Sequence, residues 1–311
     1  MAITFRNLPK GSTIGSGSYV FRHYGDETPA VVIPDLCFTA KEAGSTVAMA
    51  VNGTPRKGQA FEVSVNGLDW HAFTPGNTTI TLVNVGDKVY FRGDNTTVSE
   101  SNSIYYKFVM TGKISASGNI MSLLDKTCKS TTISNNYCYY YMFYGCTSLT
   151  TAPSLPATTL ANYCYYYMFR GCTSLTTAPS LPATTLTSYC YSSMFYGCTS
   201  LTTAPSLPAT TLVNDCYRNM FHGCKSLTTA PSLPATTLAN NCYRNMFRDC
   251  TSLQVYSSSG TGHTKAWRIP TSGSASSYTS QTSMFYGCPG SYKTTSTVSL
   301  NTTFYTQNTL V

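Results

Sequence analysis

CTSLTTAPSLPATTL occupies residues 146–160, and the same fifteen residues return at 172–186 and 198–212. A fourth copy at 224–238 differs only at Lys225. Between the copies runs a second pattern, Cys-Tyr-x-x-Met-Phe-x-Gly-Cys, which starts at Cys138 and returns every 26 residues, with Asp249 in place of glycine in the fifth copy. A fixed period of this length is typical of a solenoid, in which each unit stacks on its neighbours. The repeat therefore predicts a solenoid and disfavours an enzyme.

The spacing of apolar residues predicts the local structure of one unit. Residues 149–155 have strand-compatible threonines, and Pro153 limits the strand to a short one. After a threonine that can cap a helix, apolar side chains recur at every fourth position from Leu160 to Cys172, which is the stripe of an amphipathic helix. Gly171 suits the helix end. The fold class expected is an α/β repeat solenoid, leucine-rich-repeat-like, with a short strand and a helix in each unit.

One unit is too small to fold alone, because ordering its backbone costs about 1–2 kcal/mol per residue and few large side chains are buried in return. Stacking must therefore create a shared interior. The residues expected in this core are Cys138, Met142, Phe143, Cys146, Leu149, Leu155, Leu160, Cys164, Met168, Phe169 and Cys172.

Composition narrows the possible partners. Only 10% of the residues are charged, and the net charge of +8 is spread along the chain without a basic run. A nucleic-acid footprint is therefore not expected. The first residues, MAITFRNLPKGSTIG, do not form a signal peptide, and no stretch has the ~20 apolar residues of a membrane span. We expect export by another route, such as release within a phage particle, or a chain whose export signal has been removed.

Ten of the thirteen cysteines form two series at the 26-residue period, eight residues apart within a unit. On a helix this offset is about 12 Å of rise, beyond the reach of a disulfide. Each cysteine should therefore meet its equivalents in adjacent units. Reduced ladders in the core are favoured, with bridges between strand-side and helix-side cysteines as the rival.

Four segments are expected along the chain. Residues 1–35 are an N-terminal arm or docking segment, and residues 36–120 are a β-sandwich of immunoglobulin-like size, with strands at 36–39, 46–51, 61–65, 78–83, 88–92 and 104–110. Trp70 is expected to be a core or sheet-edge aromatic. Residues 121–290 are the solenoid with its caps, and residues 291–311 close it.

The repeats carry a resemblance. C-x-x-L-T-x-A-P-x-L-P-A-T-T-L followed by C-Y-x-x-M-F-x-G-C resembles the BspA-like leucine-rich repeats of surface proteins from gut and oral anaerobes, and residues 64–93 with 105–124 are similar to the β module that often precedes them. The resemblance implies display at a surface, binding to proteins or host structures, and no enzymatic activity. Related repeats also occur in phages of these bacteria, which suits an N-terminal docking segment without a signal.

No catalytic constellation is present in the repeats. Asp215 and Asp249 are the only acidic residues within 138–253 and belong to different units, so paired-carboxylate chemistry is not expected. The four histidines are isolated, and the C-x7-C spacing differs from that of structural zinc sites. We therefore expect no catalytic residue, no metal and no cofactor.

Positions that vary between otherwise identical units should face solvent. Tyrosine and arginine recur at these positions, and both are enriched where proteins bind partners. Free drift on a solubilising face is the alternative, and a threonine ladder at 150–151 and its equivalents is a second candidate surface. The candidate ligand-binding residues are Tyr140, Tyr141, Tyr144, Tyr166, Tyr167, Arg170, Tyr196, Arg218, His222, Arg244 and Arg248.

The function expected is that of a non-enzymatic virion protein, a fibre, decoration or tail-associated component. Residues 1–35 would bind other virion proteins, and the repeats would contact a host surface protein or glycan, with no nucleic acid and no membrane insertion. A homo-oligomer is compatible with this role. The alternatives are a BspA-like bacterial surface adhesin and an accessory module that targets a carbohydrate.

Overall fold

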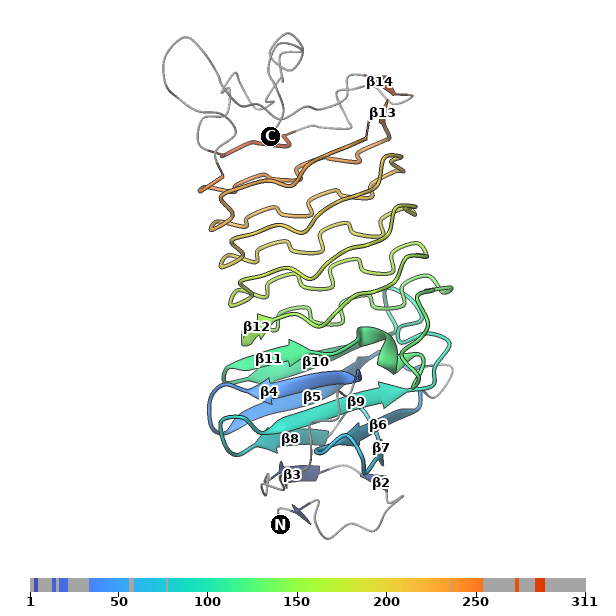
Figure 1. The fold of residues 1–311 in the computed structure, drawn as a ribbon, viewed down its shortest axis with the longest axis vertical. Coiled ribbons are helices and arrows are strands. Elements are labelled where there is room, and N and C mark those ends of the chain that lie inside the picture. Colours follow the sequence, from blue (N-terminus) through green and yellow to red (C-terminus); the bar gives the residue numbers. More distant parts are fainter. Residues whose placement is uncertain are drawn as a thin grey trace.

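The computed structural model describes residues 34–253, except 56–58, 77 and 236, together with residues 283–288 and the backbone of short strands at 3–4, 13–14, 17–21 and 272–273. Two parts share one long axis (Figure 1). A β-sandwich forms the N-terminal part, and the repeats continue from it as a stack of near-identical rungs. We number the rungs from the sandwich outward: residues 137–162, 163–188, 189–214, 215–240 and 241–253, with residues 283–288 stacked beyond the fifth.

The sandwich forms because its strands alternate buried and exposed side chains, so that one face of each sheet is apolar. Both β5 and β10 alternate in this way. The six strands expected from the sequence are present, and β7 and β11 are additional. The bounds are β4 (Leu36–Ala40), β5 (Ser45–Asn52), β6 (Phe61–Ser64), β7 (His71–Phe73), β8 (Thr78–Leu82), β9 (Lys88–Gly93), β10 (Tyr105–Thr111) and β11 (Ile114–Ser117).

Two sheets enclose the sandwich core. One has the order β1-β3-β8-β5-β10 and the other β12-β11-β4-β9-β6-β7-β2. The first residues add β1 (Ile3–Thr4), β2 (Thr13–Ile14) and β3 (Gly17–Phe21). Strand β3 runs parallel to β8, and β2 runs parallel to β7. The segment expected as a docking arm thus contributes two strands to one sheet and one strand to the other, at the end of the sandwich away from the rungs (Figure 1).

The predicted helix in each unit, and with it the leucine-rich-repeat-like α/β class, is wrong. Apart from the 3-10 turn η2 (Ile120–Leu123), the residues that the structure describes contain no helix. Outside the sandwich they contain only the short strands β12 (Leu149–Thr151), β13 (Thr237–Leu238) and β14 (Ser272–Gly273). The rest of each rung consists of stacked turns and extended chain.

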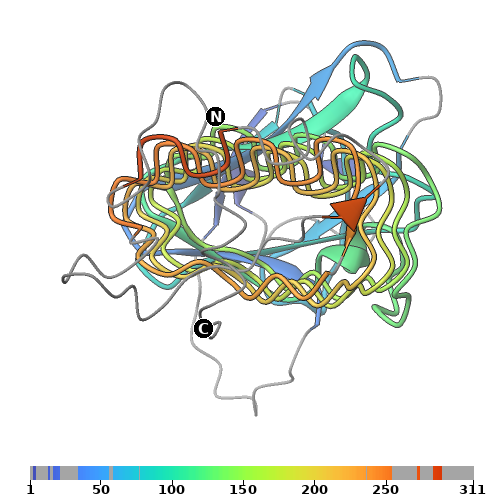
Figure 2. The ribbon, with the colours of Figure 1, turned by 90° about the horizontal axis from the view of Figure 1, so that it is seen from above.

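Residues 137–146 and their equivalents, which we call the turn tract, show why the helix does not form. Every second N–H group bonds within the rung, as from Tyr140 to the carbonyl of Tyr137 (2.9 Å). The alternate N–H groups bond to the next rung, as from Tyr139 to the carbonyl of Cys164 (2.9 Å). An α-helix would direct all of them to its own segment. The chain instead waves from side to side along the wall of the stack (Figure 2).

The wave has a period of four residues, and one residue in each period has a positive φ. In the first rung these residues are Tyr137, Tyr141 and Gly145, with φ of 63°, 60° and 73°. L-residues avoid this left-handed region, and a right-handed helix cannot contain it at every fourth position. The four-residue wave brings every fourth side chain into the interior, so the apolar residues recur at i and i+4. One face of a helix would give the same spacing.

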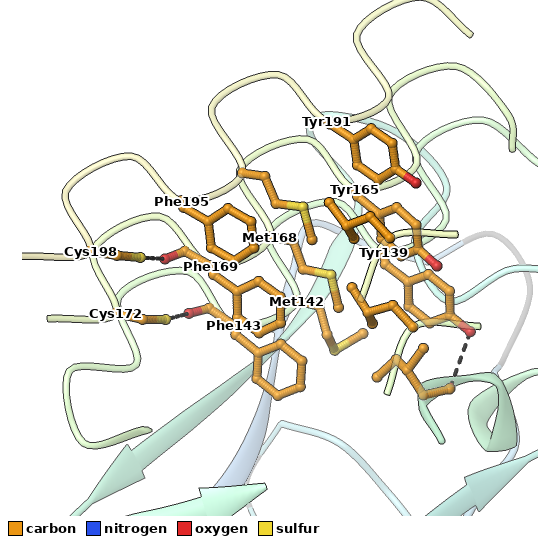
Figure 3. Close-up of a cluster of buried hydrophobic side chains, with 14 of the residues drawn as sticks. Tyr139, Met142, Phe143, Tyr165, Met168, Phe169, Cys172, Tyr191, Phe195 and Cys198 are labelled. Carbon is orange, nitrogen blue, oxygen red and sulfur yellow. Dashed lines mark hydrogen bonds between the residues drawn. The ribbon is translucent and has the colours of Figure 1, made fainter. Parts of the chain in front are cut away.

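The interior of the stack consists of ladders of identical side chains, one from each rung (Figure 3). Phe143 and Phe169 stack with ring centroids 5.1 Å apart and planes 2° apart, and this stacking continues to Phe285. Tyr139 begins a second aromatic ladder, with Tyr165 at 5.7 Å. The methionine beside each phenylalanine is fully buried. All eleven residues expected in the core are buried, at 0–7% exposure.

Thirteen free cysteines are present in the structure. In the second series, each thiol donates to a backbone carbonyl of the preceding rung: Cys172 to Phe143 at 3.1 Å, and Cys198 to Phe169 at 3.0 Å. The same phenylalanine carbonyl also accepts the N–H of the cysteine in its own rung, as from Cys146 to Phe143 (3.1 Å). The thiol thus satisfies the second acceptor site of a buried carbonyl without leaving the core.

The sandwich supplies the surface on which the first rung stacks. Phe108 of β10 lies 5.4 Å from Phe143, with 17° between the ring planes, so it is the first ring of the phenylalanine ladder. Its N–H donates to the carbonyl of Met142 (2.8 Å). Strand β12 also pairs in parallel with β11. The boundary predicted at residue 120 therefore falls within a continuous hydrogen-bonded stack.

Candidate functional site

The turn tract directs a fixed set of positions outward. Because methionine, phenylalanine and cysteine occupy the interior positions, the residues between them form columns on the outer wall, one residue per rung. We call the following three columns the recognition face. Column one is Tyr140, Tyr166, Ser192, Arg218 and Arg244; column two is Tyr141, Tyr167, Ser193, Asn219 and Asn245; column three is Tyr144, Arg170, Tyr196, His222 and Arg248.

The eleven candidate ligand-binding residues all lie in these columns, on a wall of turns instead of the expected helix. Ten of them are half-buried. Tyr140, which was expected at the surface, is only 6% exposed, because Tyr105 and Tyr166 cover its ring. Ser192 and Ser193 are buried as well, at 1% exposure. The third rung therefore offers mainly Tyr196 to a partner.

Tyrosine dominates the end of the face nearest the sandwich. Tyr140 and Tyr166 stack at 5.6 Å with planes 4° apart, and Tyr141 and Tyr167 stack at 5.2 Å with planes 14° apart. Tyr105 of β10 lies 5.0 Å from Tyr141 and extends this cluster onto the sandwich. These rings are held by their neighbours, so little side-chain entropy remains to be lost when a ligand binds.

Cations and aromatic rings alternate at the sandwich end of column three. The guanidinium of Arg170 lies 5.8 Å from the ring of Tyr144 in the preceding rung and 4.6 Å from the ring of Tyr196 in the following one. Lys107 lies 5.6 Å from the Tyr144 ring, on the sandwich side. Cation–π contacts of this kind orient the cation without neutralising it. Arg170 therefore keeps its charge and its donors available at the surface.

Polar contacts replace ring stacking in the fourth and fifth rungs. The Nη1 group of Arg218 donates to Oδ1 of Asp215 (3.2 Å), and Nδ2 of Asn245 donates to Oδ1 of Asn219 (3.0 Å). The carboxylate of Asp249 lies 3.2 Å from Nε2 of His222, and 3.5 Å from Nε of Arg248. The face therefore changes along its length from an aromatic platform to a group of hydrogen-bond donors.

Burial shifts the pKa values of three of these groups in favour of their neutral forms. It raises the pKa of Tyr140 and of Tyr166, so both hydroxyls remain protonated and able to donate near neutral pH. Burial also lowers the pKa of His222, although the Asp249 carboxylate opposes this shift. The imidazole is therefore mostly neutral near pH 7.

The residues that the sandwich contributes to the recognition face were not predicted from the sequence. Tyr105 and Lys107 extend the face beyond the first repeat. A signal was present: Tyr105 precedes Phe108 by three residues, as Tyr140 precedes Phe143. Tyr137, Tyr163 and Tyr189 were also missed, and they stack beside the face at 4.7 and 4.5 Å.

Trp70 lies away from the face, at a turn of the sandwich. Its ring is covered by the guanidinium of Arg92 at 3.9 Å, and its indole N–H donates to the carbonyl of Gly67 (3.1 Å). It is half-buried, and its contacts are those of a sheet-edge aromatic.

The exposed threonines form the second candidate surface. Thr151, Thr177, Thr203 and Thr229 pair through successive parallel bridges. The hydroxyls of Thr176 and Thr202 donate to the carbonyls of Thr150 and Thr176 in the preceding rungs, at 3.4 and 3.2 Å. This ladder therefore uses part of its hydrogen-bonding capacity to hold the rungs together.

Two further properties hold for the described part of the chain. It contains no group of three or more histidine, cysteine, aspartate or glutamate side chains placed to hold a metal ion. It also contains no helix long and apolar enough to cross a membrane. Among known proteins, no family model, no curated sequence and no solved structure matches this chain, so its function is inferred from the geometry of the recognition face.

Proposed function

We propose that this protein is a non-enzymatic attachment protein of a phage particle, a fibre, decoration or tail-associated component, whose recognition face binds the surface of the host cell. The observation that carries the proposal is the alignment of tyrosine, arginine and asparagine in three adjacent columns on one wall. Tyrosine and arginine are enriched among the few residues that carry most of the binding energy at protein interfaces, because they combine contact area with directed hydrogen bonds.

The charges of the recognition wall and its repetition over several rungs are better suited to attachment than to catalysis. Two carboxylates lie on the recognition wall, and each is close to a cation of the face: Asp215 to Arg218, and Asp249 to Arg248. The face also spans successive rungs, so several weak contacts can act together on one extended ligand. A rigid wall with repeated contacts is suited to holding a surface polymer or a surface protein.

The two ends of the molecule suit two different partners. Strands β1, β2 and β3 lie at one end and the outer rungs lie at the other (Figure 1). We propose that residues 1–35 bind other particle proteins, and that the sandwich keeps the rungs away from the particle. The resemblance of the repeats to BspA-like surface proteins agrees with display at a surface.

Binding of the purified full chain to intact host cells tests the recognition face. Tyr166→Leu/Tyr167→Leu should weaken binding about tenfold or more, because it removes ring area from the tyrosine cluster of the face. Thr177→Ala/Thr203→Ala is the matched control on the other surface and should leave binding unchanged. Equal binding by all three proteins would contradict the proposal.

Mass spectrometry of purified phage particles tests the location separately. Peptides of this protein should be present in stoichiometric amounts after particles are banded and washed. If the particles lack these peptides while the face still binds cells, the protein is a cell-surface adhesin instead.

A further inference from the structure

The fourth and fifth rungs carry related groups of donors at the outer end of the recognition face. Arg218, Asn219 and His222 lie on one rung, and Arg244 and Arg248 lie one rung further out. The N–H of Asn219 donates to the carbonyl of Arg244 (2.9 Å), which holds the two rungs in register. Hydrogen-bonded neighbouring strands lie about 4.8 Å apart, so these side chains form one compact patch. We call it the arginine patch.

Some buried N–H donors of the arginine patch lack partners among the residues that the structure describes. Arg244 forms no ion pair with any carboxylate of the described residues, and its buried Nε has no hydrogen-bond partner there. The buried Nε of Arg218 also has no hydrogen-bond partner among the described residues. Buried polar groups without partners are uncommon in native proteins, and they point to a ligand or solvent that completes them.

The charge of this wall is unbalanced. Residues 138–253 contain five cations, of which four lie on the recognition face, against the two carboxylates of Asp215 and Asp249. The fifth cation, Lys225, is exposed outside the three columns. This excess attracts an anionic ligand, but it is too small and too scattered for the run of phosphates in a nucleic acid.

We infer that the arginine patch binds the carboxylate or sulfate groups of an acidic polysaccharide, whose sugar rings pack on the tyrosines of the inner rungs. This inference rests on the proposed attachment function and specifies its ligand. The planar guanidinium of arginine presents paired donors that match a carboxylate or sulfate. The side-chain amides of Asn219 and Asn245, which are hydrogen-bonded to each other, follow Arg218 and Arg244 in the sequence and can bond to sugar hydroxyls. Tyr166 and Tyr167 lie two rungs inward of Arg218, at a distance of about 10 Å along the stack.

The experiment measures binding of the full chain to three immobilised polymers by biolayer interferometry. Polygalacturonic acid presents carboxylates, dextran sulfate presents sulfates, and dextran is the neutral control. Arg218→Gln/Arg244→Gln removes two charges from the patch, and Lys129→Gln/Lys225→Gln removes two exposed charges elsewhere. Circular dichroism and thermal unfolding verify the fold of each variant. Arg244→Lys keeps the charge but loses the paired donors.

The expected result is that at least one acidic polymer binds and dextran does not. Arg218→Gln/Arg244→Gln should weaken this binding about tenfold or more, and the lysine double variant should change it by less than about twofold. Arg244→Lys should give an intermediate loss. Equal losses in the two double variants would show simple ion exchange and overturn the inference, as would binding that is unaffected by the arginine changes or equally tight to dextran.

Cell attachment distinguishes this inference from the proposed function. If Tyr166→Leu/Tyr167→Leu abolishes attachment while Arg218→Gln/Arg244→Gln retains both attachment and polymer binding, then the face is an attachment surface and the acidic-polysaccharide inference fails. If neither variant affects attachment, the proposed function fails as well.

Discussion

The thiol of Cys198 donates a hydrogen bond of 3.0 Å to the backbone carbonyl of Phe169, which belongs to the preceding rung. The equivalent bond recurs from Cys146 to Cys288. Cysteine is small enough to lie beside the phenylalanine ladder and still supplies a weak donor. This relationship explains why a chain with thirteen cysteines does not need disulfides to hold its rungs together.

Replacing one of these thiols should destabilise the stack. Cys198→Ala removes the bond to Phe169 and leaves a small cavity at a fully buried position, so we expect the free energy of unfolding to fall by about 1–3 kcal/mol. Urea unfolding measures this change. Thr203→Ala, at an exposed position, is the control and should change stability by less than about 0.5 kcal/mol. Equal effects would mean that the thiol bond and its packing contribute nothing specific.

The thiols should be present but unreactive in the folded protein. Burial raises the pKa of Cys190 to about 12 and that of Cys138 to about 11, so at pH 8 both remain neutral thiols, whereas thiolate is the reactive form. We expect Ellman's reagent to react slowly with native protein and to count thirteen thiols after denaturation without reductant. A lower count would establish disulfides, the rival reading of the sequence.

Two buried tyrosines in one ladder should respond in opposite ways to loss of the hydroxyl. The hydroxyl of Tyr139 donates to the carbonyl of Ile120 (3.2 Å), whereas that of Tyr191 is buried without a partner in the described residues. Tyr139→Phe should therefore lower stability by about 1 kcal/mol, and Tyr191→Phe should leave it unchanged or raise it. Thermal unfolding of both variants tests this contrast, and equal losses would contradict it.

Backbone strain at Ser193 offers a stabilising substitution. Its φ is 55°, and its hydroxyl is buried without a partner, whereas the next two rungs have Asn219 and Asn245 joined by a side-chain hydrogen bond at this position. Ser193→Asn should extend that ladder, and asparagine tolerates a positive φ, so we expect a gain of about 0.5–1 kcal/mol. Ser193→Val should instead lose about 1–2 kcal/mol, because a branched side chain resists this backbone region. Denaturant unfolding midpoints of Ser193→Asn and Ser193→Val, compared with that of the unchanged protein, test both expectations.

The stability of the outer rungs should depend on pH through His222. Its pKa is lowered in the folded state by burial, so the unfolded chain binds the proton first as pH falls below the ordinary value of 6.5. Stability should therefore rise with pH between the lowered pKa and 6.5, and should be constant above that range. Between about pH 5 and 7.5, the melting temperature should rise less steeply with pH for His222→Gln than for the unchanged protein. If the melting temperature depends on pH equally in both proteins, other titratable groups cause that dependence.

Alternation of apolar and polar residues predicted six of the sandwich strands. The six expected strands match β4, β5, β6, β8, β9 and β10 closely, because each has one apolar face and a turn at its end. Strand β7 was missed because its three residues are too few to show a pattern. Parallel pairing by the N-terminal strands depends on distant residues, so local sequence could not predict it.

The repeat itself was recognisable, but its local structure was misassigned. A four-residue wave and one face of a helix give the same apolar spacing, so Leu160, Cys164 and Met168 could not distinguish them. A discriminating signal lay in the fourth rung, where Asp215, Asn219 and Gly223 recur every fourth residue. These residue types favour a positive φ, and the structure gives all three that conformation. In the tyrosine-rich rungs only the glycine, as at Gly145 and Gly171, carries this signal, because tyrosine occupies the other two positions.

The direction of the hydrogen bonds between rungs determines how the molecule responds to tension. These bonds join each turn tract to the next along the long axis, so a force that pulls the two ends apart acts on all the interfaces in series, and the weakest interface separates first. Each rung that detaches releases 26 residues, which extend to about 86–94 Å in place of a folded height of about 4.8 Å. An anchored molecule would thus lengthen stepwise under load and dissipate mechanical work while its outer contacts hold.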